Sequence, residues 1–445
     1  MAERRDLTSG RARRAIKIGG LASQVGSSYL WTSLRRPFLN TGRYDRELLD
    51  THLKNARRVV EGSQQLRGAF MKLIQMLSTR ADILPGEALD ILKATQSSVP
   101  PMDYPLIAKQ IRREFSKSPE QLFASFEPEA FAAASLGQVH RARLKSGEEV
   151  AVKIQYPGVD ATVEQDLGNL KLLLRTLQAI AGDIMRQKIE TKTIFTELAE
   201  RLREELDYVT EARNIAEFNR LLAGDEDIVL PRVIKNLSSR RVLTMTYVDG
   251  YRLGDIFGPH TDAKLRAWVA RKYYCLVWRQ ILEFGVLHTD PQPGNYLVSY
   301  HPKLGILDFG SVRHFSEPVR KASLQLAQAI IARDDRAMAA ALVKLGYIDR
   351  TQAPAPMVKI IYLLFEPVIT DRPYHPDEFD AIGKAATVSE IAFEHKLYKS
   401  PRHSIFLIRA LIGLDGIMKG LGAKLNYAAL FRECVRHAVK ARGSD

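Results

Sequence analysis

Two short stretches in the second half of the chain place acidic and amide side chains at a spacing that suits phosphoryl transfer. Asp290 and Asn295 form the pattern D-x-x-x-x-N, and Asp308 opens an Asp-Phe-Gly sequence shortly afterwards. In such a set one carboxylate accepts the proton of the nucleophile or orients it, while the asparagine oxygen and the second carboxylate hold Mg²⁺ against phosphates. We therefore predict that Asp290 acts as base or orienter and that Asn295 and Asp308 bind Mg²⁺.

The segment between the two patterns predicts how these side chains are held. Residues 296–300 and 304–307 are apolar runs separated by turn residues, which is typical of a β-hairpin. A hairpin at this place would fix the two carboxylates side by side. The spacing is that of the catalytic loop and D-F-G motif of kinases. His288 stands where kinases keep a histidine, and we interpret it as a structural residue that ties the loop to the core.

A lysine that could hold phosphates lies far upstream, in the sequence Val-Ala-Val-Lys that ends at Lys153. The turn at residues 145–147 and the apolar alternation over residues 149–155 predict that Lys153 lies on the second strand of a hairpin. Alternation alone would leave Lys153 on a solvated face of that strand. The V-A-x-K pattern instead favours a lysine that contacts the α- and β-phosphates of a nucleotide.

The stretch before this hairpin is where a phosphate loop is expected, between residues 126 and 139. It contains Ala132, Ala133, Ala134 and Ser135, and Gly137 is the one candidate loop glycine. Alanine disfavours positive φ, and its methyl group limits how closely backbone N–H groups approach phosphate oxygens. An alanine run alone would be interpreted as helix. As a phosphate loop it should hold the nucleotide differently from a glycine-rich loop.

The net charge of the chain favours anionic partners but does not distinguish among classes of anionic partner. The 445 residues carry 65 Lys and Arg against 51 Asp and Glu, a net charge of +14, so nucleotides, anionic lipids and nucleic acids all match in sign. No interleaved basic and aromatic module supports nucleic acid, which is not expected as a partner. The two cysteines cannot form a disulfide framework, which indicates a reducing compartment. The longest apolar runs, 357–369 and 405–414, contain charges and are interpreted as buried helices.

The first 44 residues are rich in arginine and contain no acid after Asp6. Three interpretations stay open for them: an amphipathic helix on a membrane surface, an organellar transit peptide, and a solvated basic helix that packs on the domain. A secretory signal does not fit, because no uninterrupted apolar segment follows the basic residues. Helical periodicity continues from residue 44 to 78 and, with breaks, from 86 to 115.

The middle of the chain reads as helices followed by strands. Amphipathic patterns cover residues 159–181 and 190–222, and residues 228–234 and 241–248 are predicted as strands of the smaller lobe. A helix is expected over 262–285. A further helix begins at Glu317, so no long activation segment follows Gly310. A peptide substrate would therefore lack its usual platform.

These motifs together closely resemble the UbiB/AarF family of atypical kinases. The residues that carry the resemblance are the alanine stretch 132–140, residues 150–158, the sequence Glu205-Leu-Asp-Tyr-Val-Thr-Glu211-Ala-Arg-Asn214, the Asp290 loop and Asp308. The resemblance implies a kinase-like fold that uses ATP and Mg²⁺ and is linked to ubiquinone biosynthesis or isoprenoid-lipid homeostasis. It also implies that ATP hydrolysis, or phosphorylation of a small or lipid-like acceptor, replaces ordinary protein phosphorylation.

The resemblance assigns further residues. Glu211 corresponds to the helix glutamate that pairs with Lys153, and the backbone around Tyr247 and Val248 corresponds to the segment that contacts adenine in kinases. Glu205 and Asp207 form the E-x-D pair of the family. Helical spacing places Asp207 and Glu211 on one face, although a solvated acidic face is the alternative for Asp207.

The K-x-G-Q motif of the family is matched by Lys72 and Gln75, with Ile74 in place of the glycine. A bulky Ile74 would alter the docking of this N-terminal extension, or the surface opposite has adapted to it. An exposed helix lysine is the alternative interpretation of Lys72.

The sequence thus predicts an α+β, kinase-like fold of two lobes with helical extensions at both ends. Residues 1–121 form the basic segment and helical extension, 122–248 the N-lobe with a helical insert, and 249–445 a helical C-lobe. The first hypothesis is an ATPase or small-molecule kinase with a lipid or quinone-precursor ligand and peripheral contact with an anionic membrane. The second is a non-catalytic, ATP-gated scaffold for membrane-associated partners. The expected location is the cytoplasm or the inner face of a membrane, on the matrix side if mitochondrial.

Overall fold

The structure is a computed structural model that describes residues 11–66, 102–134, 136–168, 171, 191–397 and 401–442. Lys72, Ile74, Gln75 and Ser135 lie outside the described residues. The chain divides into two units, and each is described by itself. Residues 1–212 and 233–247 make the first unit, and residues 213–232 and 248–445 make the second.

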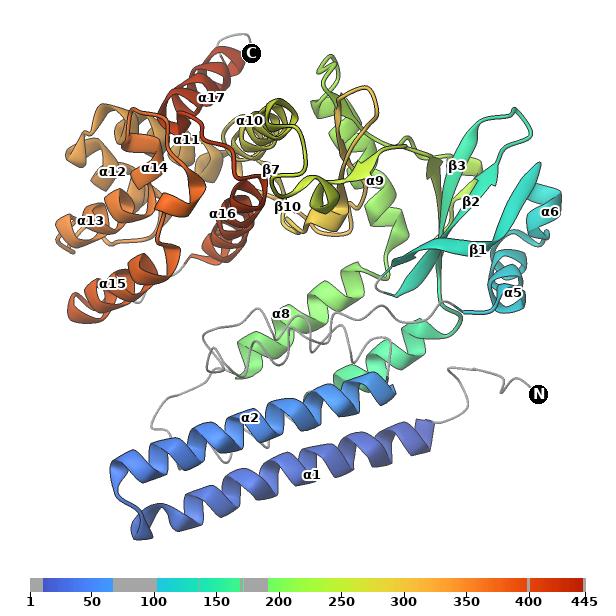
Figure 1. The fold of residues 1–445 in the computed structure, drawn as a ribbon, viewed down its shortest axis with the longest axis horizontal. Coiled ribbons are helices and arrows are strands. Elements are labelled where there is room, and N and C mark those ends of the chain that lie inside the picture. Colours follow the sequence, from blue (N-terminus) through green and yellow to red (C-terminus); the bar gives the residue numbers. More distant parts are fainter. Residues whose placement is uncertain are drawn as a thin grey trace. The chain divides into compact units, whose positions relative to one another are not determined.

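The first unit is built around an antiparallel sheet with strand order β1-β2-β3-β5 among the described residues (Figure 1). Its strands are β1 (Ser125–Ala134), β2 (Gly137–Arg143), β3 (Glu149–Gln155) and β5 (Val242–Thr246). The predicted hairpin is confirmed, since Arg143 pairs with Glu149 and Val139 with Lys153. Helices α5 (Tyr104–Phe115) and α6 (Pro119–Leu122) precede the sheet.

Apolar side chains fix helix α5 against the sheet. Ile107 and Ile111, four residues apart on one face of α5, pack against Val150, Val152 and Ile154 of β3. Residues 159–168 are helical and, with α8 (Thr191–Glu204), enclose a second cluster that includes Val163 and Leu202. All residues of β3 after Glu149 are buried, so both faces of this strand are covered by protein.

The N-terminal region of the first unit is a helical hairpin of α1 (Arg11–Arg35) and α2 (Thr41–Leu66). Polar pairs hold the two helices together: Thr32 and Thr51 hydroxyls at 2.8 Å, and Tyr29 hydroxyl with His52 Nδ1 at 2.8 Å. Leu30, Trp31, Leu34 and Phe38 remain exposed at the end of this hairpin. Helix α1 thus packs on α2, and an apolar row is exposed at the end of the hairpin.

The second unit contains a sheet with order β4-β9-β8-β6, a two-stranded sheet of β7 and β10, and a set of helices. The strands are β4 (Ile228–Val229), β6 (Tyr251–Arg252), β7 (Val286–His288), β8 (Tyr296–Val298), β9 (Leu304–Ile306) and β10 (Val312–His314). The predicted hairpin between Asn295 and Asp308 is confirmed as the antiparallel pair β8–β9.

The helices of the second unit follow in chain order. They are α10 (Ala263–Arg279), which runs into a π-helical turn (Gln280–Phe284), α11 (Glu317–Ala332), α12 (Asp335–Leu345), α13 (Ala355–Leu364), α14 (Glu366–Ile369), α15 (Ala381–Glu394), α16 (Arg402–Leu421) and α17 (Tyr427–Arg442). The predicted helix after Gly310 is confirmed, because α11 begins at Glu317 directly after β10. Among the described residues, no helix is both long enough and apolar enough to cross a membrane.

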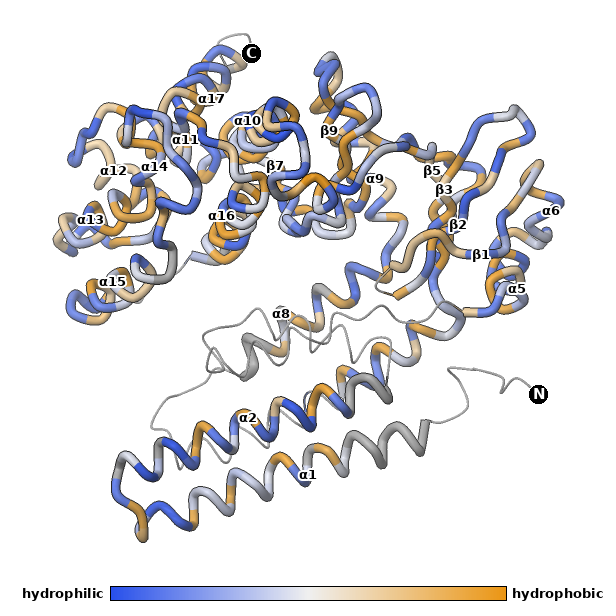
Figure 2. Tube along the Cα trace, viewed as in Figure 1, coloured by the Kyte–Doolittle hydropathy of each residue, from blue (hydrophilic) through white to orange (hydrophobic). Residues whose placement is uncertain are grey.

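Three predictions about these elements are wrong. Of the strand predicted over 228–234, residues 228–229 pair in parallel with β9 of the second unit, whereas Val233 forms an isolated antiparallel bridge with Met245 of β5 in the first unit. The helix predicted over 190–222 is two helices, α8 and α9 (Tyr208–Leu221), because Asp207 caps the start of α9. Helix α16 is not fully buried, since Ile405, Ile408 and Ile412 are exposed, and Figure 2 shows apolar positions recurring along it.

Candidate active site

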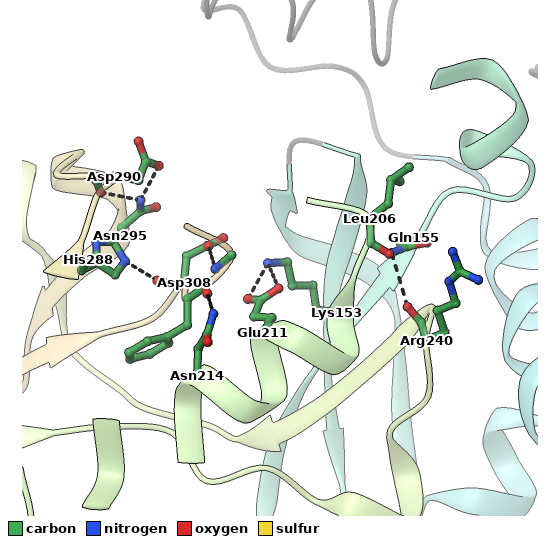
Figure 3. A network of polar contacts seen from close by, with 12 residues as sticks. Lys153, Gln155, Leu206, Glu211, Asn214, Arg240, His288, Asp290, Asn295 and Asp308 are labelled. Atoms are coloured by element: carbon green, nitrogen blue, oxygen red, sulfur yellow. Dashed lines mark hydrogen bonds and ion pairs between the residues drawn. The ribbon is translucent and has the colours of Figure 1, made fainter. Parts of the chain in front are cut away.

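Lys153 and Glu211 form a buried ion pair in the first unit. The ammonium Nζ of Lys153 donates to both carboxylate oxygens of Glu211, at 2.7 and 2.9 Å (Figure 3). The residues are 8% and 3% exposed, so the solvated face that alternation alone predicts for Lys153 is wrong. The Tyr208 ring lies 5.1 Å from the same ammonium group. The pairing that the family resemblance implies for Glu211 is therefore present.

The start of helix α9 places Glu211 opposite strand β3. Asp207 precedes the helix, and its Oδ1 accepts hydrogen bonds from the backbone N–H groups of Val209 and Thr210, both at 3.1 Å. This is the interaction that favours aspartate at a helix N-terminus. Gln155 Nε2 also donates to the Leu206 carbonyl at 2.7 Å, which ties the residues before the helix to the end of β3.

The cap changes the interpretation of the E-x-D pair. Glu205 and Asp207 lie in the break between α8 and α9 rather than within one continuous helix. The sequence alone favoured one continuous helix because the apolar periodicity runs through the break. Asp207 thus has a structural role in presenting Glu211, whose N–H donates to the Asp207 carbonyl at 3.1 Å one helical turn later.

The alanine stretch is strand rather than loop. Ala132, Ala133 and Ala134 end β1 and pair with Val139, Gln138 and Gly137 of β2, so the connection is limited to residues 135–136. A side chain on Gly137 would overlap the Ile154 carbonyl of the neighbouring strand and come 3.1 Å from the Tyr208 hydroxyl. Gly137 is therefore required for close strand packing, which differs from the loop role expected for it.

In the second unit, Asn295 holds Asp290. The Asn295 Nδ2 donates to the Asp290 carbonyl at 3.0 Å and to its Oδ2 at 2.8 Å (Figure 3). Both N–H bonds of the amide are directed at Asp290, so the amide oxygen lies at the opposite corner of the planar group. The Asn295 carbonyl accepts the Leu307 N–H at 2.9 Å, which sets Asn295 across the hairpin end from the residue that precedes Asp308.

His288 and Asn214 fix the Asp-Phe-Gly segment. The Nε2 atom of His288 lies 2.5 Å from the Asp308 carbonyl, and the His288 N–H donates to Gln280 Oε1 at 2.7 Å. His288 is 3% exposed, which confirms its structural interpretation. Asn214 Nδ2 donates to the Phe309 carbonyl at 2.8 Å, and the fully buried Phe309 ring packs on Phe218.

The donor set in the second unit suits Mg²⁺. Asp308 supplies a carboxylate whose Oδ1 also accepts the Gly310 N–H at 2.9 Å, and Asn295 supplies an amide oxygen. Mg²⁺ in phosphate-transfer sites is held by one or two protein oxygens together with phosphate oxygens and water. Among the described residues no cluster of three His, Cys, Asp or Glu side chains forms a closed metal site. The carboxylate of Asp308 and the amide oxygen of Asn295 are donors of the kind that such a Mg²⁺ ion takes from protein.

Tyr247 directly follows β5, the last strand of the first unit. Its N–H donates to the Glu149 carbonyl at 3.0 Å, and its ring packs against Phe131 and beneath the Arg141 guanidinium, 4.4 Å from the ring centroid. That N–H is thus bonded within the sheet, while the Tyr247 carbonyl and the backbone of Val248 are the groups expected to contact adenine. That contact stays a prediction.

A buried histidine should make the stability of the first unit depend on pH. His140 is fully buried on β2, and burial lowers the pKa of its imidazole. Its Nδ1 atom lies 2.8 Å from the Glu127 carbonyl and its Nε2 2.9 Å from Gln138 Nε2, an arrangement that the neutral Nδ1–H tautomer satisfies. The unfolded chain therefore binds a proton below about pH 6.5 that the folded chain does not.

We expect the free energy of unfolding to fall as the pH drops below about 6.5, by up to about 1.4 kcal/mol per pH unit from this residue. Urea unfolding at several pH values between neutrality and mild acid measures this slope. His140→Gln should show a shallower slope than the wild-type protein in the pH interval between about 6.5 and the lowered pKa of the folded His140. Equal slopes in the two proteins would contradict the assignment.

Several residues that contact the candidate site were not identified from the sequence. Gln155, Tyr208 and Asn214 lie in the quoted motifs but received no role, and Arg409 was noted only as a charge that interrupts an apolar run. Asn214 could have been found, because it is three residues after Glu211 and so shares a helix face with it. No signal in the sequence marks Arg409.

The match to a protein-family model shows which family the chain belongs to. The model of the ABC1 atypical kinase-like domain matches residues 94–342, which is more than half of the chain. The chain belongs to the ABC1 atypical kinase-like family. This family includes proteins named for aarF and for coq-8, so the resemblance to UbiB/AarF proteins is confirmed.

Members of the ABC1 family from plants and animals align over most of the chain. An aarF domain-containing protein kinase of the Arabidopsis thaliana chloroplast is 30% identical over 410 residues, 92% of this chain and 56% of that protein. The mitochondrial atypical kinase coq-8 of Caenorhabditis elegans is 28% identical over 394 residues, 85% of this chain and 50% of that protein. The chain thus spans about half the length of these two relatives.

A solved structure of similar fold supports the kinase-like class. A Mycobacterium tuberculosis protein, solved in complex with erythromycin, superimposes with a TM-score of 0.62 at 24% identity and covers 88% of this chain and 98% of that one. Together with the ABC1 family match, this likeness confirms the predicted α+β, kinase-like fold.

Proposed function

We propose that this ABC1-family protein binds ATP with Mg²⁺ and transfers or hydrolyses the γ-phosphoryl group. The observation that carries the proposal is the buried, bidentate ion pair of Lys153 and Glu211. Taking two charges out of water is costly, so such a pair is weak evidence of a purely stabilising role. In kinases a strand lysine paired with a helix glutamate is oriented in this way to contact the α- and β-phosphates.

The second unit supplies the remaining roles in this proposal. Asp308 and the amide oxygen of Asn295 would hold Mg²⁺, which neutralises charge on the phosphates when bound. Asp290, held by Asn295, would accept the proton of the attacking hydroxyl or water, or orient it. The proposal requires that Lys153 and these three side chains reach one nucleotide.

The acceptor is proposed to be water or a small or lipid-like molecule. Helix α11 begins directly after β10, so the segment after Gly310 is too short to form the platform on which kinases bind peptides. The relative named coq-8 and the family resemblance support a link to ubiquinone or isoprenoid-lipid metabolism.

We further propose that the end of the α1–α2 hairpin contacts an anionic membrane. Trp31 and Phe38 are 66% and 86% exposed there, and Arg35, Arg36 and Arg43 are exposed in the same turn region. Exposed aromatic side chains beside arginines are typical of surfaces that bind anionic lipid interfaces.

Nucleotide binding and turnover by the purified protein test the proposal. Calorimetric titration with ATP should show binding that requires Mg²⁺, and turnover should rise when vesicles of phosphatidylcholine and phosphatidylserine replace vesicles of phosphatidylcholine alone. Absence of Mg²⁺-dependent ATP binding would overturn the proposal. Binding without any turnover, with or without a quinone-precursor analogue, would favour the ATP-gated scaffold instead.

A further inference from the structure

Asp290 is held by a second residue, which comes from the C-terminal region. Arg409 of helix α16 donates from Nη2 to the Asp290 Oδ1 at 2.7 Å, across 119 positions of sequence. The other carboxylate oxygen, Oδ2, accepts from Asn295. Each oxygen of Asp290 therefore has its own donor, and the carboxylate is fixed in orientation rather than free to rotate.

The positive charge beside Asp290 has no source within the loop itself. The residues between Asp290 and Asn295 are Pro, Gln, Pro and Gly, none of which is basic. The Arg409 and Asp290 side chains are 31% and 21% exposed, so the pair is partly shielded from water and both side chains remain accessible in part.

Helix α16 packs closely against the loop of residues 290–295. A methyl group added to Gly413 would overlap the ring of Pro291, the residue that follows Asp290. Gly413 lies one turn after Arg409, so both face the same loop. A third contact comes from Phe406, whose ring lies 4.8 Å from the Arg313 guanidinium on β10. Helix α16 thus touches the segments on both sides of the β8–β9 hairpin.

We propose that Arg409 is a positioning residue that α16 delivers to the catalytic loop. It holds the Asp290 carboxylate toward the acceptor and supplies the cation that residues 291–294 lack. The inference rests on the proposed phosphoryl-transfer function for its kinetic consequences. Its structural content, that α16 fixes the loop, does not depend on any turnover.

Replacing Arg409 tests the proposal on the full-length protein. We expect Arg409→Met to lower the kcat of ATP turnover about tenfold while the KM for ATP changes less than about twofold, because the change misplaces Asp290 and leaves the nucleotide contacts intact. Arg409→Lys restores the charge and should recover most of the kcat. Arg432→Met is the matched control, since it removes a 2.9 Å ion pair with Asp371 in the same unit.

A pair of glycine variants tests the packing of α16 against Pro291 without changing any charge. Gly413→Ala should lower kcat in the same way, because the added methyl displaces Pro291. Gly416→Ala on the same helix should leave kcat unchanged, since a methyl group there meets nothing within 4 Å. Both changes favour the helix equally, by about 1 kcal/mol, so a difference between them reports the contact with the loop.

Hydrogen exchange of the backbone amides of residues 288–296 tests the role of Arg409 independently of ATP turnover. It therefore distinguishes an error in this inference from an error in the proposed function. Arg409→Met should raise exchange there at least about tenfold over the wild type and Arg432→Met should not, whether or not ATP is turned over. A wild-type protein without turnover would refute the proposed function, and the exchange result would then decide the role of α16. Unchanged exchange, or a kcat that stays level or rises in Arg409→Met, would overturn the inference.

Discussion

Replacing Asp308 with asparagine is expected to lower ATP turnover by about 100- to 1,000-fold, because the variant loses the one carboxylate proposed to bind Mg²⁺. Asparagine keeps an oxygen at the position that accepts the Gly310 N–H at 2.9 Å, so the turn should survive the change. Steady-state turnover at saturating Mg²⁺ measures the effect. The apparent affinity for Mg²⁺ should fall together with kcat.

The matched control is Asp371→Asn, the same chemical change at a side chain that is 60% exposed and paired with Arg432. This variant should retain wild-type turnover. Slow turnover that is equal in the wild type and in Asp308→Asn would show that any measured hydrolysis does not use this carboxylate. That result would favour the scaffold hypothesis over an enzyme.

Breaking the buried pair of Lys153 and Glu211 is expected to give the largest loss of stability. Lys153→Met removes the ammonium group that neutralises the buried Glu211 carboxylate, 3% exposed, and should lower the free energy of unfolding by about 3–5 kcal/mol. Urea unfolding measures the change. The double variant Lys153→Met/Glu211→Leu should recover most of that loss, because apolar side chains of similar volume replace a desolvated charge pair at little net cost.

Nucleotide binding separates the two roles of this pair. Both the single and the double variant should bind ATP much more weakly than the wild type, although only the single variant is strongly destabilised. Wild-type ATP affinity in the stable double variant would refute a phosphate contact for Lys153. It would leave the ion pair with a structural role only.

The sequence predicted the elements near the site where local patterns are strong. Turn residues and apolar alternation located the hairpin that carries Lys153 and the hairpin between Asn295 and Asp308, and both are present. Local periodicity failed at Asp207, because one side-chain cap ends a pattern that apolar spacing continues. It failed again at residues 228–229, since a two-residue strand carries too little sequence to indicate its partner.

Contacts between distant segments could not be predicted in this way. Asn214 with Phe309 and Arg409 with Asp290 join residues 95 and 119 positions apart, and no spacing rule connects them. The exposed stripe of Ile405, Ile408 and Ile412 shows the same limit, because apolar composition alone does not tell which helix face the rest of the chain covers. The family resemblance supplied the Lys153–Glu211 pair, for which the residues alone gave only a lysine and an acidic helix.

The first unit is built from two separate segments of the chain, and this arrangement predicts whether truncated fragments can fold. Strand β5 belongs to the first unit but is reached only after residues 213–232 of the second. A product that stops before residue 233, whether from proteolysis or truncated expression, would expose the edge of β3 that β5 normally pairs. That bare edge presents unpaired N–H and C=O groups beside Lys153, and we expect such fragments to aggregate rather than to accumulate as a folded first unit.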